Sequence, residues 1–143
     1  MARIALSYPN AYVAQVSLGA NGMQLIKALK EAVEHQGPSI IIAYTPCISH
    51  GIKGGMENSV EMEKMATMSG YFPIFRYLPE TDTFHLDSKN VDFDLYEEFL
   101  MKQTRYAMLE VINPKHAKEL LESQKEEAMK RYEYYKSLEK NHE

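Results

Sequence analysis

The most constraining part of the sequence is Pro38–Gly51, an apolar run that ends abruptly in a loop. Within it, Ile40–Tyr44 is β-branched and apolar, which is typical of a strand buried on both faces of a parallel sheet. Pro46 ends this pattern, and Cys47, His50 and several glycines follow. In open α/β sheets, ligands bind just beyond the carboxyl ends of the strands. The sequence therefore places Cys47 where α/β proteins bind ligands.

The residues before this stretch predict a strand and a helix that complete a βαβ unit. Tyr12–Ser17 is rich in β-forming residues, and Asn21 followed by Gln24 has the spacing of a capping box. The helix that follows has an apolar face and a charged face, and Gly37 ends it. A strand, a helix and a strand within roughly 30 residues predict a parallel βαβ unit.

The middle of the chain predicts a helix and two short strands. Asn58 is a candidate cap for the helix. Tyr71–Leu78 is rich in aromatic residues and predicts a strand, which Pro73 places at the edge of a sheet. Phe84–Asp87 is expected to form a brief extended segment that pairs with this strand.

Two helices are expected to close the chain. Apolar residues at helical spacing predict one helix over about Asp92–Val111, and Asn113-Pro114 is a start signal for the second. The predicted fold class is α/β, a partial parallel sheet with a βαβ core and C-terminal helices. We divide it into the βαβ unit and cysteine loop (1–56), a helix with short strands (57–90) and the C-terminal helices (91–143).

The composition excludes several classes of partner. The chain has 143 residues, a formal net charge of -4 and a pI of about 5.8, and it has no basic stripe with which to bind nucleic acid or an anionic membrane. No apolar run reaches the ~20 residues of a spanning helix, and the N-terminus lacks a signal-peptide pattern. A single cysteine excludes an internal disulfide. We therefore expect a cytoplasmic protein that binds neither nucleic acid nor membrane.

Three interpretations of Cys47 are compatible with its surroundings. It is a buried thiol that packs as a small apolar group, a nucleophile paired with His50, or one thiolate ligand of a metal or cluster. The nucleophile would need a third group to orient His50, and the sequence offers no obvious one. The ligand would need partners elsewhere, because one cysteine cannot hold a metal. The residues alone therefore predict a ligand-prone loop and no particular reaction.

From Tyr12 onward, the sequence resembles the C-terminal part of pyruvate:ferredoxin (flavodoxin) oxidoreductase, also called pyruvate synthase. The Pro46-Cys47-Ile-x-His50-Gly51 block is the most specific part of the resemblance. Further blocks occur in family order and cover nearly the whole chain: Tyr12–Asn21, Gln24–Ala32, Gly37–Ile52, Leu86–Lys89 and Arg131–Tyr135.

The resemblance implies a function and a role for one residue. Enzymes of this family decarboxylate pyruvate on thiamine diphosphate, pass electrons through 4Fe-4S clusters to ferredoxin or flavodoxin, and transfer the acetyl group to coenzyme A. The family's matching cysteine supplies the fourth thiolate of the cluster nearest the thiamine, and an upstream domain supplies the other three. By this resemblance, Cys47 is a metal ligand, and no residue of the chain is implied as catalytic or as binding the thiamine cofactor.

Parts of the family pattern are absent. The Gly-Asp-Gly motif that holds Mg²⁺ and the diphosphate does not occur, and neither do the Cys-rich domain and the domains that bind pyruvate and coenzyme A. We therefore expect residues 1–143 to be a C-terminal fragment of the thiamine-diphosphate-binding domain, inactive alone and without a cofactor of its own. The alternatives are a separately encoded subunit and a non-catalytic protein–protein interaction module.

The fragment interpretation also predicts partners. A piece of a parallel sheet exposes a strand edge and apolar helix faces that its neighbours would cover. The expected partners are the rest of the oxidoreductase and, through the full enzyme, ferredoxin or flavodoxin. The isolated chain is expected to self-associate, and a homo-oligomer is expected.

Overall fold

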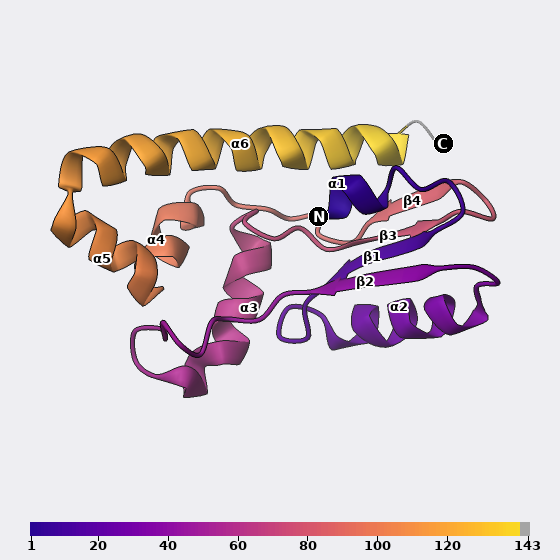
Figure 1. Ribbon diagram of the computed structural model, residues 1–143, viewed down its shortest axis with the longest axis horizontal. Helices are drawn as coiled ribbons and strands as arrows, with labels where there is room; N and C mark the ends of the chain where they lie inside the picture. The colour runs from indigo at the N-terminus through magenta and orange to yellow at the C-terminus, as the bar shows by residue number, and fades with distance from the viewer. Residues whose placement is uncertain (141–143) are drawn as a thin grey trace.

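The computed structural model describes residues 1–140 and contains a mixed four-stranded sheet with helices on both faces (Figure 1). The last three residues of the predicted 91–143 segment lie outside the described part. The strand order is β2-β1-β3-β4, with β1 and β2 parallel and the other neighbours antiparallel. The strands are β1 (Tyr12–Val16), β2 (Ser39–Ala43), β3 (Phe75–Leu78) and β4 (Thr83–Leu86). The predicted α/β class is confirmed.

The βαβ unit forms where the local signals predict it. β1 and β2 pair in parallel, and α2 (Gly22–Glu34) connects them. The side-chain oxygen of Asn21 accepts a hydrogen bond from the backbone N–H of Gln24 at 3.0 Å, which confirms the predicted cap. All five residues of β1 are buried, because β1 lies between β2 and β3 and has helices over both faces.

Two predictions about strand position are wrong. β2 is not buried on both faces, since it lies at the edge of the sheet and its residues are half-buried or exposed. β3, in contrast, is an interior strand despite Pro73. The reason is that Pro73 precedes the strand, so its missing N–H is not needed in the ladder, and its carbonyl accepts a hydrogen bond from Gln15 at 2.7 Å.

The two faces of the sheet carry different helices. Tyr12 and Ala14 face α2, while Val13 and Phe75 face the short helix α1 (Ala2–Ala5) and the long helix α6 (Pro114–Lys140). In Figure 1, α6 lies along one side of the strands and α2 along the other. The alternation of side chains along each strand therefore divides the core into two layers.

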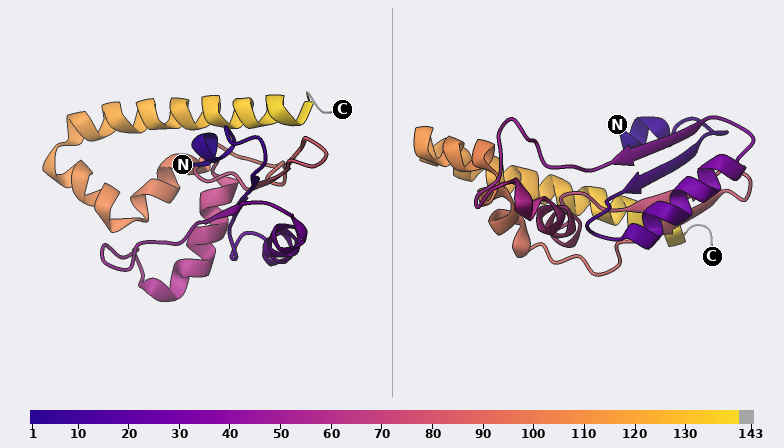
Figure 2. Two further views of the ribbon diagram at one scale, coloured as in Figure 1. Left: turned by 45° about the vertical axis from the view of Figure 1, so that its right-hand side comes forward. Right: turned by 90° about the horizontal axis from the view of Figure 1, so that it is seen from below.

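A second group of helices lies beyond one end of the sheet, as Figures 1 and 2 show. They enclose a core that includes Met62, Met65 and Phe99. The short 3-10 helix η1 and three α-helices form this part of the molecule: η1 (Met56–Asn58), α3 (Ser59–Met68), α4 (Leu95–Met101) and α5 (Thr104–Ile112). Asn58 occupies the N-cap position of α3 as predicted, but its side chain makes no capping hydrogen bond.

The predicted helix over Asp92–Val111 is broken into α4 and α5. The break lies at Lys102 and Gln103, where Gln103 has an extended backbone and forms an isolated β-bridge with Ile52. The backbone N–H of Lys53 also donates to the carbonyl of Lys102 at 2.8 Å. The loop at Ile52 and Lys53 thus makes hydrogen bonds with backbone groups that would bond within the helix if the helix were continuous.

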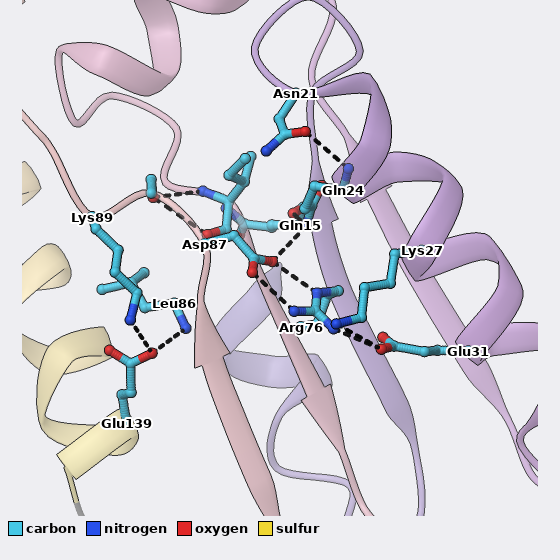
Figure 3. Close-up of polar contacts among 12 residues, drawn as sticks. Gln15, Asn21, Gln24, Lys27, Glu31, Arg76, Leu86, Asp87, Lys89 and Glu139 are labelled. Carbon is cyan, nitrogen blue, oxygen red and sulfur yellow. Dashed lines mark hydrogen bonds and ion pairs between the residues drawn. The ribbon is translucent and has the colours of Figure 1, made fainter.

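A buried arginine links α2 to the far strands of the sheet (Figure 3). Arg76 on β3 forms two hydrogen bonds to Asp87, at 2.9 and 3.0 Å, and one to Glu31 of α2 at 2.6 Å. Glu31 also accepts from the hydroxyl of Tyr12 at 2.9 Å, and Asp87 accepts from Gln24 at 3.0 Å. The network fixes the orientation of α2 on the sheet.

Candidate functional site

Cys47 lies in the loop that follows β2, on the side of the molecule where α3, α4 and α5 gather. The backbone N–H of Tyr44 donates to the carbonyl of Val16 at 3.0 Å, which extends the pairing with β1 by one residue. A turn follows, in which the N–H of Gly51 donates to the carbonyl of Cys47 at 2.9 Å. The structure therefore places Cys47 just beyond the carboxyl end of a parallel strand.

The thiol of Cys47 contacts the ring of His50. The sulfur and the His50 Nδ1 lie 3.1 Å apart. This hydrogen bond is the largest cause of a lowered pKa of the Cys47 thiol, which falls from 9.0 to about 7. Hydrogen bonds from the backbone N–H groups of His50 and Ser49 lower the pKa further. Because these groups donate to sulfur, they stabilise the thiolate. Cys47 is half-exposed, so it is not the buried apolar thiol of the first interpretation.

The loop is held by its contacts with the junction between α4 and α5. Ile52 and Gln103 form the β-bridge, and the N–H of Thr104 donates to the carbonyl of Gly51 at 3.3 Å. Gly51 has a φ of 71°, a left-handed conformation that glycine adopts without strain. The break in the predicted helix therefore positions the cysteine loop.

An aromatic layer supports the strand end that leads to Cys47. The ring of Tyr44 lies 5.3 Å from Phe72 and 6.1 Å from Tyr71, and Tyr71 lies 4.8 Å from Phe99. Burial raises the pKa of Tyr44 to about 12. Its hydroxyl is buried and has no hydrogen-bond partner among residues 1–140. No local sequence pattern predicts this layer, because its members come from distant segments.

The loop after β1 lies against α3 at the same end of the sheet. The N–H of Gly19 donates to the carboxylate of Glu63 at 2.8 Å, and the hydroxyl of Ser17 donates to the Glu63 carbonyl at 3.3 Å. A side chain at Gly19 would come within 2.4 Å of the carbonyl oxygen of Val60. Glycine therefore allows the ends of β1 and α3 to approach closely.

The described residues do not form a complete site for a metal ion. Within residues 1–140, no three His, Cys, Asp or Glu side chains gather closely enough to hold one. In the same range, His50 has a single side-chain partner, the Cys47 sulfur, so no third group orients its ring for nucleophilic catalysis. The geometry thus provides one half-exposed thiol paired with a histidine, which by itself is neither a metal site nor a catalytic triad.

Comparison with known proteins shows which protein family contains a segment like this chain. No family model matches the chain. It is 41% identical over 140 residues to pyruvate:ferredoxin oxidoreductase of Moorella thermoacetica and 39% identical over 140 residues to pyruvate-flavodoxin oxidoreductase of Klebsiella pneumoniae, each match covering 94% of the chain. It is also 43% identical over 129 residues, 87% of the chain, to the mitochondrial pyruvate dehydrogenase (NADP+) of Euglena gracilis. The chain is homologous to a segment of these pyruvate oxidoreductases.

The homologous segment is a small part of each relative. The chain spans 12% of the length of the Moorella and Klebsiella oxidoreductases and 7% of the Euglena protein. The identities of 39–43% confirm the resemblance to this family that the sequence shows.

Among residues 1–140, none of the helices is long and apolar enough to cross a membrane.

The lowered thiol pKa gives a testable pH dependence. The thiolate is the reactive form, and its fraction rises with pH. We expect the rate of Cys47 alkylation by iodoacetamide to rise with a midpoint at about pH 7, and His50→Ala to move that midpoint upward toward 9.0. His116→Ala, at an exposed position on α6, is the control and should leave the midpoint unchanged. An unchanged midpoint in His50→Ala would refute the pairing.

Proposed function

We propose that the chain is the C-terminal part of the thiamine-diphosphate-binding domain of a pyruvate:ferredoxin (flavodoxin) oxidoreductase. In this proposal Cys47 supplies one thiolate of a 4Fe-4S cluster, and the other three ligands come from outside residues 1–143. The observation that carries the proposal is the half-exposed thiol at the carboxyl end of β2, in a segment homologous to these oxidoreductases.

The surroundings of Cys47 fit a cluster ligand. The hydrogen bonds from His50 and from the backbone N–H groups of Ser49 and His50 stabilise the thiolate, which is the ligand form. Hydrogen bonds to sulfur also tune the reduction potential of an iron–sulfur cluster. Gly51 has no side chain that would crowd a cluster beside the loop. When bound, the cluster would supply one-electron transfer, and these residues would hold and tune it.

The full enzyme would convert pyruvate and coenzyme A to acetyl-CoA and CO₂ in the cytoplasm. Thiamine diphosphate with Mg²⁺ would be bound by residues outside this chain, which contains no Gly-Asp-Gly motif. Electrons would pass from the clusters to ferredoxin or flavodoxin. The isolated chain would have no activity, because it lacks the residues that bind the thiamine cofactor and the substrates.

A chimeric enzyme tests the role of Cys47. Residues 1–143 replace the matching region of the Moorella thermoacetica enzyme, and Cys47→Ala is compared with the unmodified chimera. We expect the variant to lose between about one and four iron atoms per polypeptide, with a change in the electron paramagnetic resonance signal of that cluster. His116→Ala, at an exposed position on α6 outside the loop, is the control and should keep the iron. Unchanged iron content together with an unchanged electron paramagnetic resonance signal in Cys47→Ala would refute the ligand role.

The separate-subunit alternative is tested by the mass of the natural polypeptide. An immunoblot of the source cells with an antibody to this chain should show a band several times larger than 16.5 kDa if the chain is part of a long polypeptide. A band near 16.5 kDa would favour a separate subunit or an interaction module.

A further inference from the structure

The outer edge of β2 offers backbone hydrogen bonds to another strand. Within residues 1–140, β2 pairs only with β1. In a parallel strand, successive N–H groups point alternately to the two sides. Because the N–H of Tyr44 donates to β1, those of Ile40 and Ile42 face β1 as well, and those of Ile41 and Ala43 face the free edge.

The side chains of β2 suit an interior strand better than an edge. Natural edge strands are protected by charges, prolines or bulges. β2 carries none of these, and the sequence of its centre is three consecutive isoleucines. Ile41 packs toward α2, while Ile40 and Ile42 pack toward α1 and α6, and all three are only half-buried. Both faces of the strand thus have apolar surface left to cover.

Helix α2 has a second apolar face that no other part of residues 1–140 buries. Ile26, Leu29 and Val33 are 60%, 48% and 83% exposed and lie at i, i+3 and i+7, so they form one row along the helix. Met23, one turn earlier, is 73% exposed. The apolar residues of α2, which the sequence pattern places on a single face, thus form one buried row and one exposed row.

The direction of the exposed row follows from the other two rows of α2. One row faces β3 and β4, where it meets the arginine network of Figure 3: Gln24, Lys27 and Glu31. The next packs on the sheet: Leu25, Ala28 and Ala32. Each row is rotated by about 100° from the one before. The exposed row therefore lies opposite the first, on the flank of α2 nearest the free edge of β2.

We propose that the free edge of β2 and the exposed row of α2 form one docking surface, the β2–α2 surface, for a strand and helix of the rest of the oxidoreductase polypeptide. The strand would pair with the outward amides of Ile41 and Ala43, and the helix would cover Ile26, Leu29 and Val33. In a layered α/β sheet, the next βα unit covers both the edge strand and the flank of the neighbouring helix. Without that unit, both surfaces are exposed on the same side, as they are for β2 and α2.

The length of the relatives determines the choice of occupant. The chain spans 7% to 12% of the relatives it matches, so most of such a polypeptide lies outside residues 1–143. The identity of the occupant thus rests on the proposed function, whereas the surface itself rests only on exposure and hydrogen bonding. A second copy of this chain is the competing occupant.

Hydrogen exchange tests the strand contact with an internal control. In the isolated chain, diluted below the concentration at which it associates, the amides of Ile41 and Ala43 should exchange at least about 100-fold faster than those of Ile40 and Ile42. In the Moorella chimera described above, all four should be protected at every concentration. Rapid exchange of Ile41 and Ala43 in the folded chimera would overturn the proposal. Protection of these two amides in a dimer of the isolated chain, combined with their rapid exchange in the chimera, would assign the surface to a second copy.

Substitutions on α2 test the helix contact. Ile26→Lys places a charge in the exposed row and should reduce the yield of assembled chimera at least about tenfold. Glu34→Lys adds a lysine to the solvent-facing side of the same helix, at a side chain 65% exposed, and should leave the yield unchanged. Far-ultraviolet circular dichroism of the isolated chain verifies that Ile26→Lys still folds. Equal yields of assembled chimera for Ile26→Lys and Glu34→Lys would overturn the helix contact. Because the yield of assembled protein is measured separately from its iron content, this outcome is distinct from a failure of the Cys47 proposal.

Discussion

Replacing Arg76 by methionine is expected to lower the free energy of unfolding by about 3–5 kcal/mol. Arg76 is 5% exposed and is hydrogen-bonded to the carboxylates of Asp87 and Glu31. Methionine fills much of the same volume but leaves the poorly solvated carboxylate of Asp87 without its counter-charge, and Glu31 with only the exposed Lys27 at 4.0 Å. The loss arises chiefly from these unpaired groups rather than from the deleted contacts.

Urea unfolding of the monomeric chain, followed by circular dichroism, measures this loss. Arg76→Lys keeps the positive charge but cannot form the paired bonds to Asp87, so a smaller loss of about 1–2 kcal/mol is expected. Lys30→Met is the exposed control, because its ion pair with Glu34 spans 3.9 Å at the surface, and it should change stability by less than about 0.5 kcal/mol. A loss below about 1 kcal/mol for Arg76→Met would mean that the network does not hold α2.

The part of the fold that could be predicted is the part whose signals are local. The cap at Asn21, the end of the helix near Gly37 and the β-forming runs on either side determine a βαβ unit without reference to distant residues. The start of α6 at Pro114 is of the same kind. Each of these signals acts within a few residues, and competing tertiary contacts did not override them.

The features that could not be predicted depend on contacts between distant segments. The central position of β1 follows from its antiparallel pairing with β3, and no local pattern specifies that neighbour. The break at Gln103 results from pairing with Ile52, about 50 residues earlier in the chain. Intrinsic helix propensity around Gln103 gives no sign of this pairing, so the sequence predicted one helix.

The candidate site shows the same division. The position of Cys47 after a strand was predictable from the end of the apolar run at Pro46, and its closeness to His50 from their spacing. The aromatic layer under Tyr44 and the exposed row of α2 were not, because both depend on which faces the tertiary structure leaves open. An apolar residue such as Val33, next to Glu34, is one local sign of the exposed row.

Phe75→Ala is expected to lower the free energy of unfolding by about 3–5 kcal/mol and to loosen the end of α6. Phe75 is fully buried, and its ring lies 4.8 Å from Phe84 and 4.9 Å from Tyr135 of α6. Removing the ring leaves a cavity between the sheet and the helix, because strand backbones held by hydrogen bonds on both sides cannot collapse into it. Urea unfolding measures the stability, and hydrogen exchange of α6 measures the local effect.

Two comparisons separate this packing effect from general damage. Tyr8→Ala removes an aromatic ring that is 58% exposed and should change stability by less than about 0.5 kcal/mol. In Phe75→Ala, exchange should accelerate around Tyr132 and Tyr135 more than in α2, because α2 packs on the opposite face and keeps its hydrogen bond between Arg76 and Glu31. Equal acceleration in both helices would mean that the two layers of the core unfold together. The sheet would then transmit the loss of one face to the other, and α6 could not be treated as a separately anchored element.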